Sequence, residues 1–155
     1  HSGGTTYFEP LIGACIESHY KSNTRAAVVE ATGSQSFEMP DIPAIAAVAH
    51  RKGALVIDDN TWATPLYHRS LDQGVDISIQ AATKYIGGHS DIMFGTISAN
   101  AATWPQIAEA IRLLGVCAGP DDVFLALRGL RTLSVRLAQH QQAGLDLAKW
   151  LTKRH

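Results

Sequence analysis

Short apolar runs alternate with segments of helical periodicity along the first hundred residues of the chain. The apolar runs predict buried strands at 26–29, 54–57 and 75–80, and each of them ends at polar residues. Helical patterns lie between them, after Asp41 and over 66–73. Strands that alternate with helices are typical of an α/β fold, with a largely parallel sheet and flanking helices.

A further strand is expected over residues 93–99. Only the loop from Lys84 to Asp91 separates it from the strand at 75–80. A parallel crossover needs about a dozen residues, so this strand is expected to run antiparallel to its neighbour.

Several helix ends can be recognised from single residues. Asp41 is placed to cap the helix that follows it, and Gly53 to end that helix. Thr103 opens a capping box at the start of a helix that ends at Gly115. Further helices are expected from Asp121 or Asp122 to Leu127, and around Leu133, Leu137, Leu147 and Leu151.

Composition restricts the class of protein. The chain has 155 residues, 46% of them hydrophobic, and 13 basic residues nearly balance 14 acidic ones. These values fit a globular protein of one domain's length and give no electrostatic argument for nucleic acid or membrane as partner. Cys15 and Cys117 lie in apolar segments and are expected to be reduced, buried thiols of a cytoplasmic protein. Because both ends look cut, we expect an internal piece of a larger protein.

A lysine and a carboxylate are expected at one edge of this sheet. Asp59 and Lys84 each follow a strand, and parallel neighbouring strands place their carboxyl ends together. Pyridoxal phosphate needs both groups: an amine that forms a Schiff base with its aldehyde and a carboxylate that pairs with its ring nitrogen. The residues alone also allow that Asp58 or Asp59 caps a loop and that Lys84 is a surface charge.

Three segments carry a resemblance that decides between these interpretations. Residues 59–63 read Asp-Asn-Thr-Trp-Ala, residues 82–85 read Ala-Thr-Lys-Tyr, and residues 88–91 read Gly-His-Ser-Asp. With the interval from Asp59 to Lys84, they resemble the Cys/Met-metabolism family of pyridoxal-phosphate enzymes. The resemblance continues through residues 75–84, 128–133 and 135–137.

The resemblance implies roles for single residues. Lys84 would form the Schiff base with the cofactor and later move the substrate's α-proton, and Asp59 would pair with the pyridinium nitrogen. Thr83 would contact the cofactor phosphate, while Ala82 stands where the family has a second hydroxyl. Ser34 falls at the position of a family asparagine and would donate a hydrogen bond near the ring hydroxyl.

The resemblance also implies fold and activity. Residues 1–155 would be the central part of the large domain of a fold-type I pyridoxal-phosphate enzyme. The expected reaction is a carbon-sulfur lyase reaction, the α,β-elimination of cystathionine in methionine biosynthesis, in a cytoplasmic homotetramer with a small amino-acid thioether as substrate. The stretch from Gln80 to Ala82 and Trp62 favour this reaction over those of γ-acting relatives. Those relatives, and a catalytically inactive fragment, stay open as alternatives.

Other conspicuous residues give weaker hypotheses. His89 and Asp91 are too few for a metal site, and a hydrogen bond that fixes their loop is favoured. Trp62 either borders the substrate cavity or packs beneath the cofactor loop. Arg128 and Arg131 either bind an anion or serve subunit contacts and a solvated face.

Overall fold

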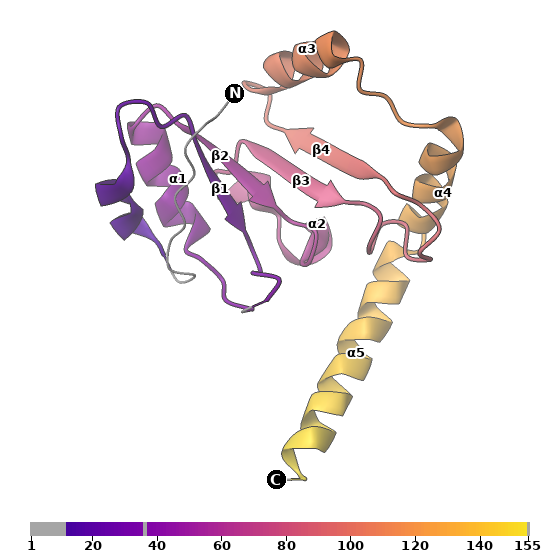
Figure 1. The fold of residues 1–155 in the computed structure, drawn as a ribbon. Coiled ribbons are helices and arrows are strands. Elements are labelled where there is room, and N and C mark those ends of the chain that lie inside the picture. The colour runs from indigo at the N-terminus through magenta and orange to yellow at the C-terminus, as the bar shows by residue number, and fades with distance from the viewer. Residues whose placement is uncertain (1–11, 36, 155) are drawn as a thin grey trace. The chain divides into compact units, whose positions relative to one another are not determined.

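The computed structural model describes residues 12–35 and 37–154 (Figure 1). They form two compact units. The first comprises the residues up to 80 together with 96–116, and the second comprises 81–95 together with 117–155.

The first unit contains most of a mixed sheet. Its strands are β1 (Ala26–Glu30), β2 (Leu55–Asp59), β3 (Ile77–Ala81) and β4 (Gly95–Ala99), in the spatial order β1-β2-β3-β4. β1 and β2 are parallel, as are β2 and β3, while β4 runs antiparallel to β3 (Figure 1). The parallel sheet and the antiparallel fourth strand predicted from the sequence are therefore confirmed.

Helix α1 (Ile42–Arg51) supplies the apolar layer against this sheet. Asp41 caps it, since the Asp41 carboxylate accepts a hydrogen bond from the Ala44 N–H at 3.0 Å. Gly53, at φ +70°, follows its C-cap. Both predicted ends of this helix are confirmed. The core beneath it is fully buried and includes Ile42, Ala46, Ala49, Val56 and Val75.

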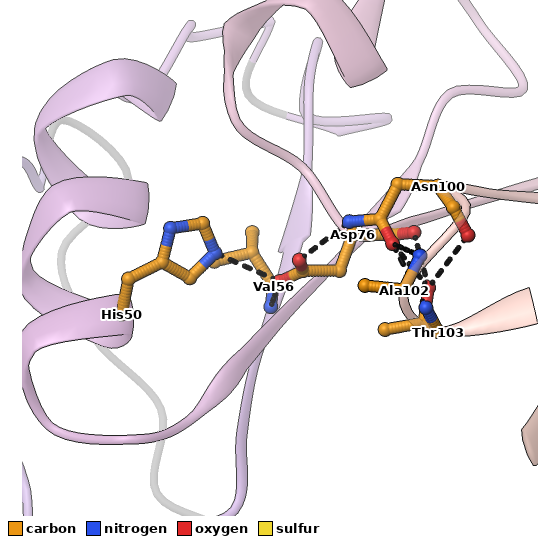
Figure 2. A network of polar contacts seen from close by, with 6 residues as sticks. All are labelled: His50, Val56, Asp76, Asn100, Ala102 and Thr103. Carbon is orange, nitrogen blue, oxygen red and sulfur yellow. Dashed lines mark hydrogen bonds and ion pairs between the residues drawn. The ribbon is translucent and has the colours of Figure 1, made fainter.

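The buried Asp76 carboxylate accepts hydrogen bonds from helix α1, strand β2 and the segment after β4 in the first unit (Figure 2). One Asp76 oxygen accepts hydrogen bonds from the Val56 N–H at 2.8 Å and from His50 Nε2 at 3.0 Å. The other Asp76 carboxylate oxygen accepts a hydrogen bond from the side-chain amide of Asn100, Nδ2, at 2.8 Å. Burial acts to raise the pKa of Asp76, but these hydrogen bonds outweigh it and hold the pKa below its ordinary value.

The capping box predicted at Thr103 is wrong. Thr103 precedes α3 (Trp104–Leu114), but its side chain makes no capping hydrogen bond. Its backbone is already helical, at φ −93° and ψ −23°, whereas a capping residue is normally extended. The Thr103 hydroxyl contacts the Asp76 carbonyl and the Asn100 side chain instead, and Asn100 accepts from the Ala102 and Thr103 N–H groups (Figure 2).

The single helix predicted over 66–73 is also wrong. Two short helices stand there, α2 (Thr64–Tyr67) and the 3-10 helix η2 (Ser70–Gln73). The chain is extended between them at His68, whose carbonyl accepts a hydrogen bond from the Asn60 side chain at 2.7 Å. A tertiary hydrogen bond has replaced a helical one at this point, which local periodicity does not reveal.

A second short 3-10 helix, η1 (Ala14–His19), precedes β1. Cys15 lies in it, and Cys117 lies in the second unit. Both cysteines are free, but both are exposed, so the expectation of buried thiols is wrong.

The second unit is a loop joined to two helices, α4 (Pro120–Leu130) and α5 (Leu133–Thr152). The helices expected near Asp121 and around Leu133 are thus confirmed. In α5, Leu133 and Leu137 are buried, while Leu147 and Leu151 are exposed. The apolar cluster of this unit contains Ala82, Ile86 and Ile92 of the loop and Ala126 of α4. No helix in the described part of the chain is long and apolar enough to cross a membrane.

Candidate functional site

Lys84 lies in the loop of the second unit, beside an open cavity of about 560 Å³. Its backbone is held in a tight turn, because its N–H donates to the Ala81 carbonyl at 3.0 Å and its carbonyl accepts from the Gly88 N–H at 2.7 Å. Within the described ranges, no hydrogen bond or ion pair engages its amine. The cavity is lined by Thr83, Lys84, Tyr85, Gly88, Ser90, Ile92, Met93, Arg136 and His140.

Thr83 lines the same cavity, but its hydroxyl already has partners. It donates to the Phe94 carbonyl at 3.2 Å and accepts from the Phe94 N–H at 2.9 Å. A hydroxyl has one proton to donate, so a phosphate contact at Thr83 would replace the longer of these hydrogen bonds.

Ala82, where the family has a second hydroxyl, is completely buried. Its methyl group packs in the apolar cluster with Ile86, Ile92 and Ala126. A hydroxyl there would have to be removed from water and find a partner inside this cluster. This surrounding is compatible with the alanine at this position.

Asp59 ends strand β2 in the first unit and is half-buried. One of its carboxylate oxygens accepts two hydrogen bonds from Thr61, from the N–H at 3.0 Å and from the hydroxyl at 2.5 Å. Among residues 12–35 and 37–154, nothing donates to the other oxygen. The aspartate therefore closes the turn after β2, as the loop-cap interpretation supposed, and still has one oxygen available.

Asp58 is directed to the opposite side of the strand from Asp59 and is fully buried. It accepts a short hydrogen bond from the Ser70 hydroxyl, and His68 Nε2 lies 3.5 Å from the same oxygen. Burial raises the pKa of the Asp58 carboxyl above its ordinary value. Strand alternation thus separates two adjacent carboxylates: Asp58 joins the interior and Asp59 keeps an accessible face.

Ser34 is exposed in the first unit, and its hydroxyl donates to a Glu30 carboxylate oxygen at 3.2 Å. Its predicted role near the cofactor ring stays a prediction. Trp62 is 42% exposed and packs edge-on against Phe37, with ring centroids 5.1 Å apart. This contact lies within the first unit and tests neither predicted role of Trp62, so both roles stay predictions.

The loop residues His89 and Asp91 have structural partners. His89 Nδ1 lies 2.8 Å from the Gly87 carbonyl, so the predicted loop-fixing hydrogen bond is confirmed. Asp91 pairs with Arg128 at 2.8 Å, which links the loop to α4. Arg128 therefore has a partner within its own unit, and the anion-binding hypothesis is not needed for it.

Arg136 is the residue of this region that the sequence analysis did not single out. It lines the cavity and donates hydrogen bonds to the carbonyls of Tyr85 and Ile86. These partners precede it by about fifty residues, and contacts at that separation leave no pattern in the local sequence. The two predicted residues Lys84 and Thr83 share this cavity, whereas Asp59 and Ser34 belong to the other unit.

Comparisons with known proteins agree with these motifs. The family model described as "Cys/Met metabolism PLP-dependent enzyme" matches residues 3–155. Cystathionine beta-lyase from Escherichia coli is 45% identical over 151 residues, and that from Salmonella typhimurium is 46% identical over 149 residues. The matches cover 96% and 95% of this chain but only 38% of each relative, so the chain spans well under half of their length.

A solved structure gives the same fold. The crystal structure of cystathionine gamma-lyase from Lactobacillus plantarum, complexed with L-serine, superposes with a TM-score of 0.90 at 30% sequence identity. This match covers 95% of the present chain and 39% of the other.

Proposed function

Because the chain belongs to the Cys/Met metabolism PLP-dependent enzymes, we propose that its protein is a cystathionine β-lyase. The proposed reaction is the α,β-elimination of cystathionine, which breaks a carbon-sulfur bond to release homocysteine; hydrolysis of the remaining three-carbon enamine by one water then gives pyruvate and ammonia. The observation that carries the proposal is the Lys84 amine, which has no partner among the described residues and lines a cavity.

The residues present fit pyridoxal phosphate, the cofactor of the family. Lys84 offers an amine that pairs with no carboxylate among residues 12–35 and 37–154, in a backbone turn held by hydrogen bonds. Asp59 offers one carboxylate oxygen to a ring N–H, while Thr61 holds the other oxygen. When bound, the cofactor supplies an aldehyde carbon for covalent attachment and a ring that withdraws electrons from the substrate's α-carbon.

The chain's own residues would then bind and move protons. Lys84 would hold the cofactor through Nζ, and the same nitrogen, when neutral, would accept the α-proton of the substrate. Asp59 stabilises a proton on the ring nitrogen, since a carboxylate favours the charged form of a neighbouring base. Thr61 keeps that carboxylate oriented, because both of its hydrogen bonds go to one oxygen.

Borohydride reduction in the presence of pyridoxal phosphate, followed by peptide mapping, tests the proposal directly. We expect a single pyridoxyl group on Lys84, none in Lys84→Ala, and unchanged labelling in Lys149→Ala, an exposed helical control. Pyruvate release from cystathionine should fall by about a thousandfold in Lys84→Ala, in the range typical of lost acid-base catalysis. Scattered labelling over surface lysines would contradict the proposal.

The second candidate is a γ-acting relative, since the L. plantarum structure that superposes is a γ-lyase. Lys84 and Asp59 would serve either reaction, so the products must discriminate. Pyruvate as the keto acid released from cystathionine supports the β-lyase, and 2-oxobutyrate supports the γ-lyase.

The cytoplasmic location and the homotetramer expected from the sequence belong to this proposal. Two free cysteines, Cys15 and Cys117, fit a reducing compartment. Sedimentation of the full-length protein would measure the assembly.

A further inference from the structure

Arg136 joins the Lys84 loop to the turn between α4 and α5. Its guanidinium donates from Nη1 to the Tyr85 carbonyl at 2.8 Å and from Nη2 to the Ile86 carbonyl at 3.3 Å. It also donates from Nη2 to the Gly129 carbonyl at 2.8 Å and from Nε to the Thr132 hydroxyl at 3.0 Å. All of these residues belong to the second unit.

This set of contacts suits arginine and no other side chain. The acceptors are three backbone carbonyls and a hydroxyl, spread around one planar fork of N–H donors. A lysine is a single flexible point charge and could satisfy only part of the set. The donors are nearly all engaged, so Arg136 has little capacity left for an anion in the cavity.

Two glycines allow the backbone to approach this arginine and α4. A Cβ atom at Gly88 would lie 2.3 Å from Arg136 Nη1, and one at Gly129 would lie 2.1 Å from the Ile86 carbonyl oxygen. Both distances are far below van der Waals contact. The loop after Lys84 is therefore held by close contact with the α4 backbone at Gly129 and with the Arg136 guanidinium.

We propose that Arg136 is the positioning residue of Lys84. It fixes the carbonyls of Tyr85 and Ile86, the two residues that follow the lysine, and so sets the direction from which the amine reaches the cofactor aldehyde. This inference rests on the proposed role of Lys84. A displacement of about 1 Å at a reacting group can lower the reaction rate by about a hundredfold, so a residue that fixes the position of Lys84 can affect the rate strongly.

The test compares Arg136→Lys with Arg131→Lys in the full-length protein. Arg131 is a suitable control, because it is exposed at the end of α4 and makes no side-chain hydrogen bond or ion pair within the described part of the chain. The first readout is the rate of covalent attachment of pyridoxal phosphate to Lys84 at saturating cofactor. The second is hydrogen exchange of the amides from Ile86 to His89 without cofactor, and the third is the unfolding temperature.

In Arg136→Lys we expect attachment to slow by about tenfold to a hundredfold and exchange to rise in the Lys84 loop alone. The unfolding temperature should change little, and Arg131→Lys should match the wild type in every readout. Equal attachment rates and equal loop exchange in the two variants would overturn the inference. A slower attachment rate in Arg136→Lys that is accompanied by a lower unfolding temperature and by faster exchange throughout the protein would also overturn the inference, because it would indicate only a structural role.

Failure of the proposed function would look different. If the wild type attaches no cofactor at Lys84, the role of Lys84 is wrong. The exchange measurement would then still decide whether Arg136 clamps the loop.

Discussion

Two of the predicted cofactor-binding residues, Asp59 and Lys84, are positioned in different ways. Asp59 is the last residue of a parallel strand, and its neighbour in the sheet, Ile79 of β3, is fixed by regular strand pairing. Lys84 stands on an irregular loop, held by hydrogen bonds from an arginine side chain to its backbone. Regular pairing follows from the hydrophobic pattern of the strands, whereas the loop depends on single residues far along the chain.

This difference indicates how sensitive the surroundings of Asp59 and of Lys84 are to substitution. The sheet around Asp59 is held by many similar backbone contacts between strands. The loop around Lys84 is held by a few contacts, each of which needs one particular side chain or a glycine. The expected effects of substitution should therefore be largest at the close contacts of the loop and smaller near the strand end.

Gly129→Ala should have the largest effect. The new methyl group would lie 2.1 Å from the Ile86 carbonyl oxygen and 2.4 Å from that of Gly87, both backbone atoms that cannot move without shifting the loop. We expect a loss of about 3 kcal/mol or more in the free energy of unfolding, with slower attachment of cofactor to Lys84. Denaturant unfolding and borohydride labelling measure the two effects.

Gly144→Ala is the matched control, also within a helix of the second unit. A Cβ atom there meets nothing within 4 Å, so the substitution should stabilise the protein by about 0.5–1 kcal/mol through helix propensity alone. Equal responses of Gly129 and Gly144 would mean that the close approach of α4 to the loop does not exist in solution.

Asp76→Asn tests the polar network of the first unit. The amide cannot accept all the hydrogen bonds that come from Val56, His50 and Asn100, so we expect a loss of about 2 kcal/mol at neutral pH. Because the folded pKa of Asp76 lies below its unfolded value, its contribution is present above the unfolded pKa and is lost as pH falls through the folded one. The variant should therefore lose less stability than the wild type on acidification below about pH 4.

The control for this series is Asp72→Asn, at an exposed pair with Arg69. It should change the unfolding free energy by less than about 1 kcal/mol. If wild type and Asp76→Asn respond identically to acid, the carboxylate of Asp76 does not have its lowered pKa.

Among the test substitutions, apart from their controls, Thr61→Val should have the smallest effect on stability. It removes the hydroxyl that donates to Asp59 but keeps the shape of the side chain and the backbone N–H bond. We expect cofactor affinity to fall by about tenfold while the unfolding free energy changes by about 1 kcal/mol. Equilibrium titration with pyridoxal phosphate measures the affinity.

Thr61→Ser retains the hydroxyl and should bind the cofactor as the wild type does. Weak binding by both variants would point to packing at Thr61 rather than to orientation of the Asp59 carboxylate.

Much of the fold could be predicted because its signals are local. The predicted strands ended near the expected residues, the Asp41 cap and the Gly53 end are present, and the strand after the Lys84 loop is antiparallel, as the short connection required. The expected burial of the first strand is wrong, because Val28 of β1 is 70% exposed and only Ala27 is buried.

Other errors lie where side chains bond across the fold. The Asn60 side chain donates to the His68 carbonyl, where the predicted helix is interrupted. Thr103 does stand at the N-cap position of α3, but its hydroxyl bonds to the Asp76 carbonyl instead of making the capping hydrogen bond.

The sequence by itself determined the family motifs and the α/β fold class. It also determined that Asp59 and Lys84 lie near the carboxyl ends of strands. Periodicity and short motifs can be recognised in this way because they are properties of neighbouring residues. Only the tertiary structure decided which carboxylate of the Asp58-Asp59 pair stays accessible, that Ala82 is buried in an apolar cluster, and that Arg136 holds the Lys84 loop. Those outcomes depend on burial and on hydrogen bonds between residues distant in the chain, which exist only after the backbone has folded.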